Sequence, residues 1–229
     1  DPDLVLLRQD RSALRQTLLK RLAAEGRRPS LAEVERHLAA LDRADGTLRL
    51  LDDVRSWGAE ITYLPADVTQ AQAVEEVVAR VIREQGRLDI LIHAAGVERS
   101  RRLESKPREE FAQILAVKAQ GFYHLYQALH HHHLWPRAMI AFTSIARRFG
   151  NAGQVDYCAG NDFLAKMMLA LRHHPAGMKT IALDWGAWAE VGMASRGHVP
   201  ELMRRAGIDL MPPEEAARWV YRELVANSG

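Results

Sequence analysis

Short apolar runs alternate with longer stretches of helical periodicity along the chain, and this alternation limits the possible folds more than any other feature. Strand-like runs cover residues 4–7, 60–64, 88–93, 138–143 and 180–184. Helical patterns cover residues 12–25, 30–42, 50–57, 69–85, 111–125 and 161–171. Strands separated by helices form βαβ units, whose mostly parallel sheet is covered by helices on both faces. The sequence therefore predicts an α/β fold.

Local signals mark several ends of these helices. Ser30 and Glu33 form a capping box at the start of the second helix, and Thr69 is the expected N-cap of the fourth. Gly46 is expected to break the helical region around it, and Gly86 to end the fourth helix. Because no internal repeat or convincing linker divides the sequence, we expect a single domain over residues 1–229.

Charge and cysteine content exclude several classes of protein. Lys and Arg number 31 against 29 Asp and Glu, and the net charge of +2 argues against an electrostatic nucleic-acid binder. The single cysteine, Cys158, excludes an intramolecular disulfide and a cysteine-based zinc cluster. The sequence has neither an apolar run of about 20 residues nor a signal-peptide pattern. We therefore expect a soluble, cytoplasmic protein that binds neither nucleic acid nor membranes.

Small residues follow the third strand-like run. In a parallel α/β sheet, ligands bind beyond the carboxyl ends of the strands, so the residues directly after each strand are of most interest. His93, Ala94, Ala95 and Gly96 occupy such a position. Their small size would let a flat ligand such as a nucleotide approach the backbone. A turn that packs a helix against the sheet explains them equally well.

Polar side chains mark the next strand end. Ser144 follows a strand, and Tyr157 lies thirteen positions later across a glycine-bearing loop. Asn161 lies four residues after Tyr157, so the two share one face of a helix. In isolation, Ser144 is explained as a helix N-cap and Tyr157 as a packing residue. Together the three residues favour a polar site at the carboxyl ends of the strands.

Three segments of the chain resemble one family. Residues 88–96 (LDILIHAAG), 142–161 (FTSIARRFGNAGQVDYCAGN) and 182–193 (ALDWGAWAEVGM) resemble the ketoreductase domains of modular polyketide and polyunsaturated fatty acid synthases. Those domains belong to the short-chain dehydrogenase/reductase superfamily. The similarity runs from about residue 4 to residue 224, and the helical insert over residues 12–45 is most similar to the fatty-acid-synthase-type subgroup. The resemblance implies a Rossmann-like, doubly wound, mostly parallel sheet.

The resemblance also implies a catalytic group of Lys118, Ser144, Tyr157 and Asn161. Reduction of a ketone builds negative charge on the carbonyl oxygen, to which Tyr157 would donate a proton and Ser144 a hydrogen bond. Lys118 would supply the cation that a phenol of ordinary pKa near 10 needs, and could hold the cofactor ribose. Asn161 would orient the lysine or a relay water. Lys166 competes for the lysine role, but the nine residues between it and Tyr157 point it away.

A nicotinamide cofactor follows from the same resemblance. Besides Lys118 and Tyr157, the expected contacts are Asp67 at the adenine edge, Val68, His93, Ala94, Ala95 and Gly96. Arg8 and Arg11 follow the first strand-like run, where the cofactor ribose should lie. Either could pair with a 2′-phosphate, which favours NADPH. Simple solvation of the two arginines is the alternative.

Residues 187–212 resemble the family's mobile substrate lid. Trp185, Trp188 and Met193 would supply apolar walls for an acyl chain and its thioester arm. Packing in the core is the alternative for tryptophans near a strand end.

Four consecutive histidines, residues 130–133, look like a metal-binding tract. Metal sites need ligands that converge in three dimensions and are oriented by further contacts. Adjacent side chains on a helix diverge by about 100°. We therefore expect no metal site.

The glycine-rich turn of the family is missing. Ketoreductases of this kind begin with a strand and a GxGxxG turn that holds the cofactor pyrophosphate, and no GxGxxG occurs in this sequence. If residues 4–7 form the family's second strand, the first, central strand is absent and its position in the sheet is empty. The chain is then a fragment of a longer reductase, which we favour, or it is completed by another chain, or it is a degenerate remnant. We expect the chain alone to bind NADPH feebly and to reduce nothing at a useful rate.

The expected function is NADPH-dependent reduction of a 3-oxoacyl thioester to the 3-hydroxyacyl thioester. The expected partners are an acyl carrier protein that bears a β-ketoacyl phosphopantetheine thioester, and the other domains of a megasynthase. Two alternatives remain: a catalytically silent ketoreductase remnant in a megasynthase, and a free-standing alcohol dehydrogenase of the same superfamily.

Overall fold

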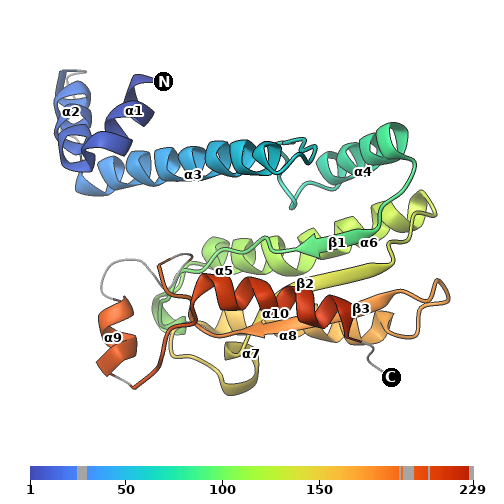
Figure 1. The fold of residues 1–229 in the computed structure, drawn as a ribbon. Coiled ribbons are helices and arrows are strands. Elements are labelled where there is room, and N and C mark those ends of the chain that lie inside the picture. The colour runs from blue at the N-terminus through green and yellow to red at the C-terminus, as the bar shows by residue number, and fades with distance from the viewer. Residues whose placement is uncertain (25–29, 191, 193–198, 206, 227–229) are drawn as a thin grey trace. The chain divides into compact units, whose positions relative to one another are not determined.

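The chain forms two compact units, residues 1–65 and residues 66–229 (Figure 1). The computed structural model describes residues 1–24, 30–190, 192, 199–205 and 207–226. Each unit has its own buried side chains, and each is described by itself. Two compact units can still belong to one domain. The expectation of a single domain over residues 1–229 therefore stays a prediction.

The first unit is helical in its described part. It contains α1 (Pro2–Gln9), α2 (Arg11–Ala24) and α3 (Leu31–Ser56). Leu14 and Leu18 on α2 pack against Val34 and Leu38 on α3, and all four side chains are buried. Each pair is spaced four residues apart, so each helix turns one apolar stripe toward the other.

The predicted strand over residues 4–7 is wrong, because these residues lie in α1. Two signals at its start favour a helix: Asp1 accepts a hydrogen bond from the Asp3 backbone N–H, and Pro2 occupies the first turn. Leu6 and Leu7 pack against the buried side chains of α2 and α3. A short apolar run fits a buried strand and one face of a helix equally well, and here the caps favour the helix.

Two further predictions for this unit are wrong. Gly46 does not break the helical region, because α3 continues through it from Leu31 to Ser56. A glycine in a helix costs only about 1 kcal/mol relative to alanine, which the rest of α3 can offset. Residues 60–64 form no strand, and the described part of this unit offers no neighbouring strand with which they could pair.

The second unit contains a parallel sheet of three strands in the order β1–β2–β3. The strands are β1 (Ile90–His93), β2 (Ala138–Ser144) and β3 (Lys179–Trp185), and Ile92, Ile140 and Ile181 lie side by side across them. Strands that are neighbours in this sheet also follow one another along the chain. The last three strands of a doubly wound sheet have the same arrangement. The predicted α/β fold with a Rossmann-like parallel sheet is therefore confirmed, but among the described residues the sheet lacks the first three strands of such a sheet and not only the first.

The second unit also contains helices, several of which pack against the sheet (Figure 1). They are α4 (Ala71–Gln85), η1 (Leu103–Ser105), α5 (Arg108–Leu115), the π-helix η2 (Ala116–Gln120), α6 (Gly121–His131), α7 (Ala146–Phe149), α8 (Val155–Leu171), α9 (Val199–Arg205) and α10 (Pro213–Val225). Gly86 ends α4 in the left-handed conformation as predicted, with φ of 68°. The residue at the N-cap of α4 is Gln70 rather than Thr69. No described helix combines the length and the apolarity that crossing a membrane requires.

The core of the second unit lies between one face of the sheet and the helices α4, α6 and α8. Buried residues from all four elements meet there, including Val74, Phe122, Met139 and Leu164. Gly121 allows the start of α6 to pack closely against Val68, because a Cβ on this glycine would lie 2.8 Å from Cγ2 of Val68.

The opposite face is less completely covered. Lys179 of β3 donates hydrogen bonds to the carbonyl oxygens of Glu223 (2.5 Å) and Leu224 (3.1 Å) at the end of α10, which ties this helix to the sheet. Ile90 and Ile92 of the edge strand β1 remain 45% and 48% exposed. The predicted cover of helices on both faces is therefore incomplete over β1.

Candidate active site

Ser144 and Tyr157 lie together at the carboxyl end of the sheet. Ser144 is the last residue of β2, and Tyr157 is in the first turn of α8, after the loop over residues 150–154. The Ser144 side chain lies close enough to the Tyr157 phenol to affect its pKa. Burial raises the pKa of Tyr157, while hydrogen bonding with the side chains of Ser144 and Asn161 acts in the opposite direction. The structure thus brings the two predicted hydroxyl groups into one site.

Asn161 lies one turn after Tyr157 and is fully buried. Its Nδ2 donates a hydrogen bond to the Tyr157 backbone carbonyl oxygen at 2.7 Å. Its Oδ1 is buried and has no hydrogen-bond partner in the described part of the chain. Because a buried acceptor without a partner is costly, this oxygen marks a place for a donor such as a water or a ligand group.

Lys118 lies in the π-helix η2 and is buried between β2 and α8. Its Nζ donates a hydrogen bond to the Phe142 carbonyl oxygen at 2.6 Å. Desolvation lowers the pKa of Lys118 to about 8. Gly160 leaves room for the lysine stem, because a Cβ on this glycine would lie 3.3 Å from Cβ of Lys118. The π-helical turn is consistent with a functional position, since such turns often occur at functional sites.

The competing lysine lies elsewhere on α8. The Lys166 side chain is 74% exposed, and its Nζ lies 2.7 Å from Oδ2 of Asp162. Nine residues separate Lys166 from Tyr157, and the exposure agrees with the expectation that it points away.

His93 supports Lys118 from the end of β1. The buried imidazole places Nε2 at 3.2 Å from the Lys118 carbonyl oxygen, and its ring packs 5.8 Å from that of Phe122. Burial and the nearby Lys118 charge lower the pKa of His93 to about 4, so the ring is neutral near pH 7. Ala94, Ala95 and Gly96 follow β1 directly in irregular backbone. Their contact with a cofactor stays a prediction.

The two residues expected near the adenine have local contacts. Oδ1 of Asp67 accepts hydrogen bonds from the backbone N–H and the hydroxyl of Thr69, at 2.9 and 2.8 Å. These bonds lower the pKa of Asp67. Val68 packs against Gly121 at the start of α6. Both residues thus shape the turn before α4, and their role toward a cofactor stays a prediction.

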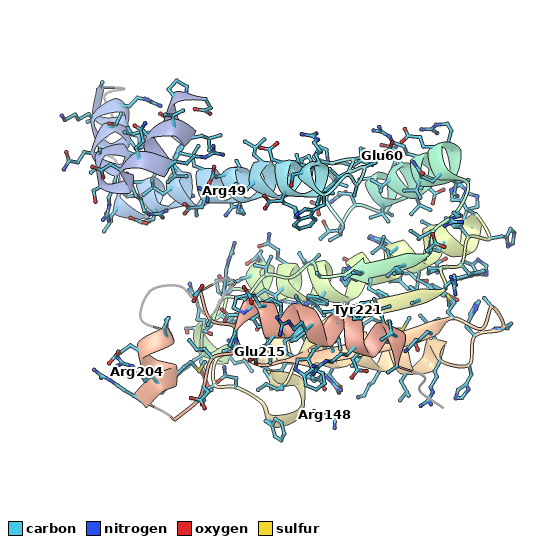
Figure 2. All side chains as sticks on the ribbon, viewed as in Figure 1. Arg49, Glu60, Arg148, Arg204, Glu215 and Tyr221 are labelled. Carbon is cyan, nitrogen blue, oxygen red and sulfur yellow. The ribbon has the colours of Figure 1, made fainter. Side chains whose placement is uncertain are left out.

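Arg8 and Arg11 do not follow a strand, which was the reason for assigning them to a 2′-phosphate. Arg8 lies 2.5 Å from Asp45, which also pairs with Arg49 (labelled in Figure 2), and Arg11 lies 2.5 Å from Asp42. These ion pairs connect the first two helices to α3. Both arginines are therefore explained as residues that hold the helices of the first unit together.

Asp184 holds the segment that carries Ser144, and the sequence analysis missed it. Its carboxylate accepts hydrogen bonds from Thr143 Oγ1 (2.6 Å) and Arg147 Nε (2.5 Å), and from Arg148 Nε (3.2 Å). Figure 2 labels Arg148. Burial raises the pKa of Asp184, but the bonds from Arg147 and Thr143 outweigh this and lower it. In the sequence, the two adjacent arginines Arg147 and Arg148 just after Ser144 indicate that a carboxylate such as Asp184 lies nearby.

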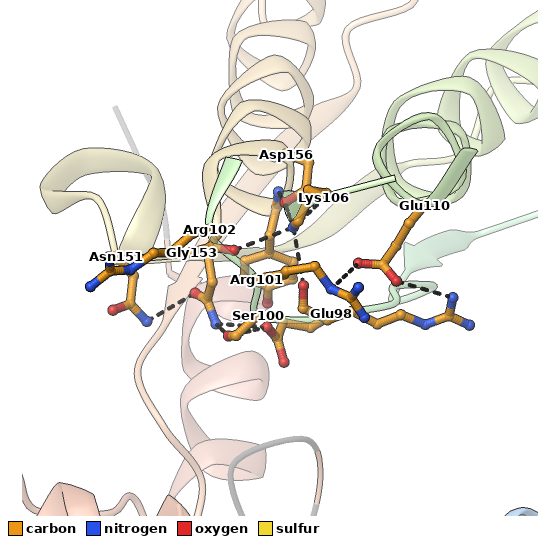
Figure 3. A network of polar contacts seen from close by, with 12 residues as sticks. Glu98, Ser100, Arg101, Arg102, Lys106, Glu110, Asn151, Gly153 and Asp156 are labelled. Atoms are coloured by element: carbon orange, nitrogen blue, oxygen red, sulfur yellow. Dashed lines mark hydrogen bonds and ion pairs between the residues drawn. The ribbon is translucent and has the colours of Figure 1, made fainter. Parts of the chain in front are cut away.

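A second polar network fixes the loop before Tyr157 (Figure 3). Gln154 donates hydrogen bonds to Glu98 and Ser100, both at 3.0 Å, and the Arg101 N–H donates to the Gly153 carbonyl at 2.9 Å. A buried pair, Lys106–Asp156, lies beside these contacts. Lys106 and Asp156 are 50 residues apart in the sequence, so the sequence pattern does not reveal this network.

Apolar rings line the end of β3. The ring centroid of Trp185 lies 5.3 Å from that of Phe142 and 5.0 Å from that of Trp188. Trp188 forms an isolated parallel bridge with Met211. Met193 and most of the expected lid between residues 191 and 198 lie outside the described residues. The lid stays a prediction.

The residues present fit the reacting end of a nicotinamide cofactor. A buried ammonium bonded to the carbonyl oxygen of Phe142, a phenol beside Ser144 and an amide oxygen without a partner in the described part of the chain lie around the carboxyl end of β2 and the start of α8. The sequence contains no GxGxxG turn for the pyrophosphate. The fit therefore concerns the nicotinamide and its ribose.

Comparison with known proteins gives consistent matches. The family model described as the KR domain matches residues 12–190. The polyketide synthase GfsB of Streptomyces halstedii is 35% identical over 184 residues, covering 80% of this chain and 3% of that protein. A polyunsaturated fatty acid synthase of a Thraustochytrium species is 28% identical over 210 residues, covering 90% of this chain and 7% of that protein.

Solved structures agree with the sequence matches. A ketoreductase domain from the bacillaene assembly line aligns with a TM-score of 0.67 at 29% identity, covering 76% of this chain and 43% of that one. The ketoreductase from the first module of phoslactomycin biosynthesis in a Streptomyces species aligns with the same TM-score at 30% identity, covering 76% of this chain and 39% of that one. The chain thus spans less than half of these structures.

Proposed function

The chain belongs to the KR domain family, and on this premise we propose that it carries the catalytic group of an NADPH-dependent 3-oxoacyl thioester reductase. The product is the 3-hydroxyacyl thioester. The observation that carries the proposal is the close approach of the Ser144 and Tyr157 side chains at the carboxyl end of β2.

Ser144 and Tyr157 act on the oxygen of the keto group. When NADPH is bound, it supplies the hydride for the carbonyl carbon. As negative charge develops on the oxygen, Ser144 donates a hydrogen bond to it and Tyr157 transfers its phenolic proton. Burial, which raises the pKa of Tyr157, keeps the phenol protonated and able to donate.

Lys118 and Asn161 support the proton transfer. The Lys118 ammonium is held by the Phe142 carbonyl oxygen, and its pKa of about 8 leaves it mostly charged at pH 7. A cation brought close to the phenol would stabilise the phenolate left after the transfer. In the loaded enzyme this ammonium would hold the nicotinamide ribose. The unpartnered Oδ1 of Asn161 would accept from a relay water that returns a proton to Tyr157.

Two ion pairs hold the hydroxyl groups in position. Arg147 binds Asp184 through two nitrogens, at 2.5 and 2.7 Å, next to Ser144. Asp156 accepts from the Tyr157 backbone N–H at 2.9 Å and pairs with Lys106. Catalysis depends on such fixed geometry, because small misplacements of reacting groups cost large factors in rate.

The substrate class follows from the apolar rings and the relatives. Phe142, Trp185 and Trp188 form an apolar wall beside Ser144, which suits an acyl chain and its thioester arm. The relatives described above are polyketide and polyunsaturated fatty acid synthases. We therefore include an acyl carrier protein with a β-ketoacyl phosphopantetheine thioester, and the other domains of a megasynthase, among the proposed partners.

A catalytically silent KR domain is the second candidate, and the missing GxGxxG turn favours it. The test is NADPH oxidation with a 3-oxoacyl N-acetylcysteamine thioester. It compares this chain with the longest natural polypeptide that contains it. The proposed reductase predicts a 3-hydroxyacyl product from the longer polypeptide. A silent domain predicts neither product nor saturable NADPH binding from either one.

A further inference from the structure

Two histidines of the tract at residues 130–133 converge on a glutamate of another helix. Nδ1 of His131 lies 3.0 Å from Oε1 of Glu75, and Nε2 of His132 lies 2.5 Å from the same oxygen. Glu75 is in α4, while His131 ends α6. We propose that Glu75, His131 and His132 bind one Zn²⁺ ion, which joins α4 to the end of α6.

The two adjacent histidines converge although neighbours on a helix normally diverge. The expected divergence of about 100° holds for neighbours inside a helix. His131 is the last residue of α6, and His132 is the C-cap with φ of −88° and ψ of 2°. The two ring centroids are nevertheless 4.8 Å apart and the ring planes differ by 35°, so the two side chains converge beyond the backbone. The reason for expecting no metal site therefore does not apply to this pair.

The donor atoms suit zinc. One oxygen and two imidazole nitrogens lie within 4.8 Å of one another. Zn²⁺ prefers imidazole and carboxylate ligands at about 2.0–2.2 Å in a tetrahedral arrangement, which small rotations of these side chains can reach. Three protein ligands leave the fourth position to water. The Glu75 and His132 side chains are 34% and 26% exposed, so both can reach an ion from solvent.

The other two histidines of the tract have different surroundings. The His130 ring packs 6.2 Å from Tyr126 and 6.0 Å from Trp135, measured between centroids. His133 adopts a positive φ of 52° and its ring lies 6.4 Å from that of His130. Neither joins the group of possible ligands that includes Glu75. The tract therefore divides into two ligands and two other residues.

Calorimetric titration of ZnCl₂ into the untagged chain tests the proposal, because a polyhistidine tag would bind zinc itself. We expect one equivalent to bind. Glu75→Gln, His131→Gln and His132→Gln should each weaken binding by at least about 10-fold, since even the residues that orient metal ligands contribute 10–100-fold. Thermal unfolding with EDTA shows whether each variant folds like the parent chain.

Two matched controls separate this site from general binding by the tract. His133→Asn retains a residue that tolerates positive φ, and Glu76→Gln removes a neighbouring charge on α4; both should leave zinc affinity unchanged. Added zinc should raise the unfolding temperature of the parent chain and of both controls. The proposal is overturned if no zinc binds, if Glu75→Gln binds as tightly as the parent chain, or if His133→Asn weakens binding as much as His131→Gln. It does not depend on the proposed reductase activity.

Discussion

The ammonium of Lys106 lies 2.6 Å from both carboxylate oxygens of Asp156, and neither side chain is exposed to solvent. Lys106 Nζ also donates to the carbonyl oxygens of Arg99 (3.0 Å) and Gly153 (3.3 Å). The pair therefore connects the segment after β1 with the loop before α8, directly beside Tyr157. A buried charge needs such partners, because its desolvation is costly.

Replacing Lys106 by methionine should destabilise the protein strongly. The change keeps an unbranched side chain but leaves the Asp156 carboxylate buried without a cation, which costs about 3–5 kcal/mol. Urea denaturation gives the free energy of unfolding. Lys166→Met is the matched control, since the exposed pair with Asp162 contributes about 0–1 kcal/mol. Equal losses in the two variants would contradict a structural role for the buried pair.

Substitution of Gly46 by alanine should stabilise the protein. Gly46 lies inside α3, and a Cβ on it would meet nothing within 4 Å. Alanine should therefore raise the free energy of unfolding by about 0.5–1 kcal/mol. Gly121→Ala should have the opposite effect, because its Cβ would lie 2.8 Å from Val68. Thermal unfolding of both variants tests the contrast, and a loss of stability in Gly46→Ala would show that α3 is strained there.

The buried Lys118 should make stability rise with pH between about 8 and its ordinary value of 10.5. In this window the folded protein has released the Lys118 proton while the unfolded chain still binds it. Stability increases with pH wherever the unfolded state binds more protons. Lys118→Met should remove this rise, and the difference between the two pH profiles isolates Lys118 from other groups such as Tyr157. Parallel profiles would mean that the lysine has an ordinary pKa.

The site was more predictable from the sequence than the fold of the first unit. Ser144, Tyr157 and Asn161 are separated by one loop and one helical turn, so the strand-end rule and local spacing place them together. The assignment of Lys118 came from the resemblance, because its contact with the Phe142 carbonyl crosses 24 residues. The pairs Lys106–Asp156 and Glu75–His132 depend on how distant segments pack, which periodicity does not reveal.

The errors have a common physical origin. The apolar runs at residues 4–7 and 60–64 were assigned to strands from composition and pattern alone. A strand needs a partner for its backbone groups, and the described part of the first unit contains none. Residues 4–7 form a helix instead, because Asp1 and Pro2 favour a helix start and the leucines of this run contact buried leucines of the first unit.

Kinetics of Tyr157→Phe test the central claim most directly. The assay measures NADPH oxidation with a 3-oxoacyl thioester by the longest natural polypeptide that contains this chain, together with NADPH affinity by fluorescence titration. Because Tyr157 is assigned to proton transfer, the variant should lose about 10²–10⁴-fold in turnover while its NADPH affinity stays the same. Turnover within a few-fold of the parent enzyme would contradict the account, since the proton would then come from another group.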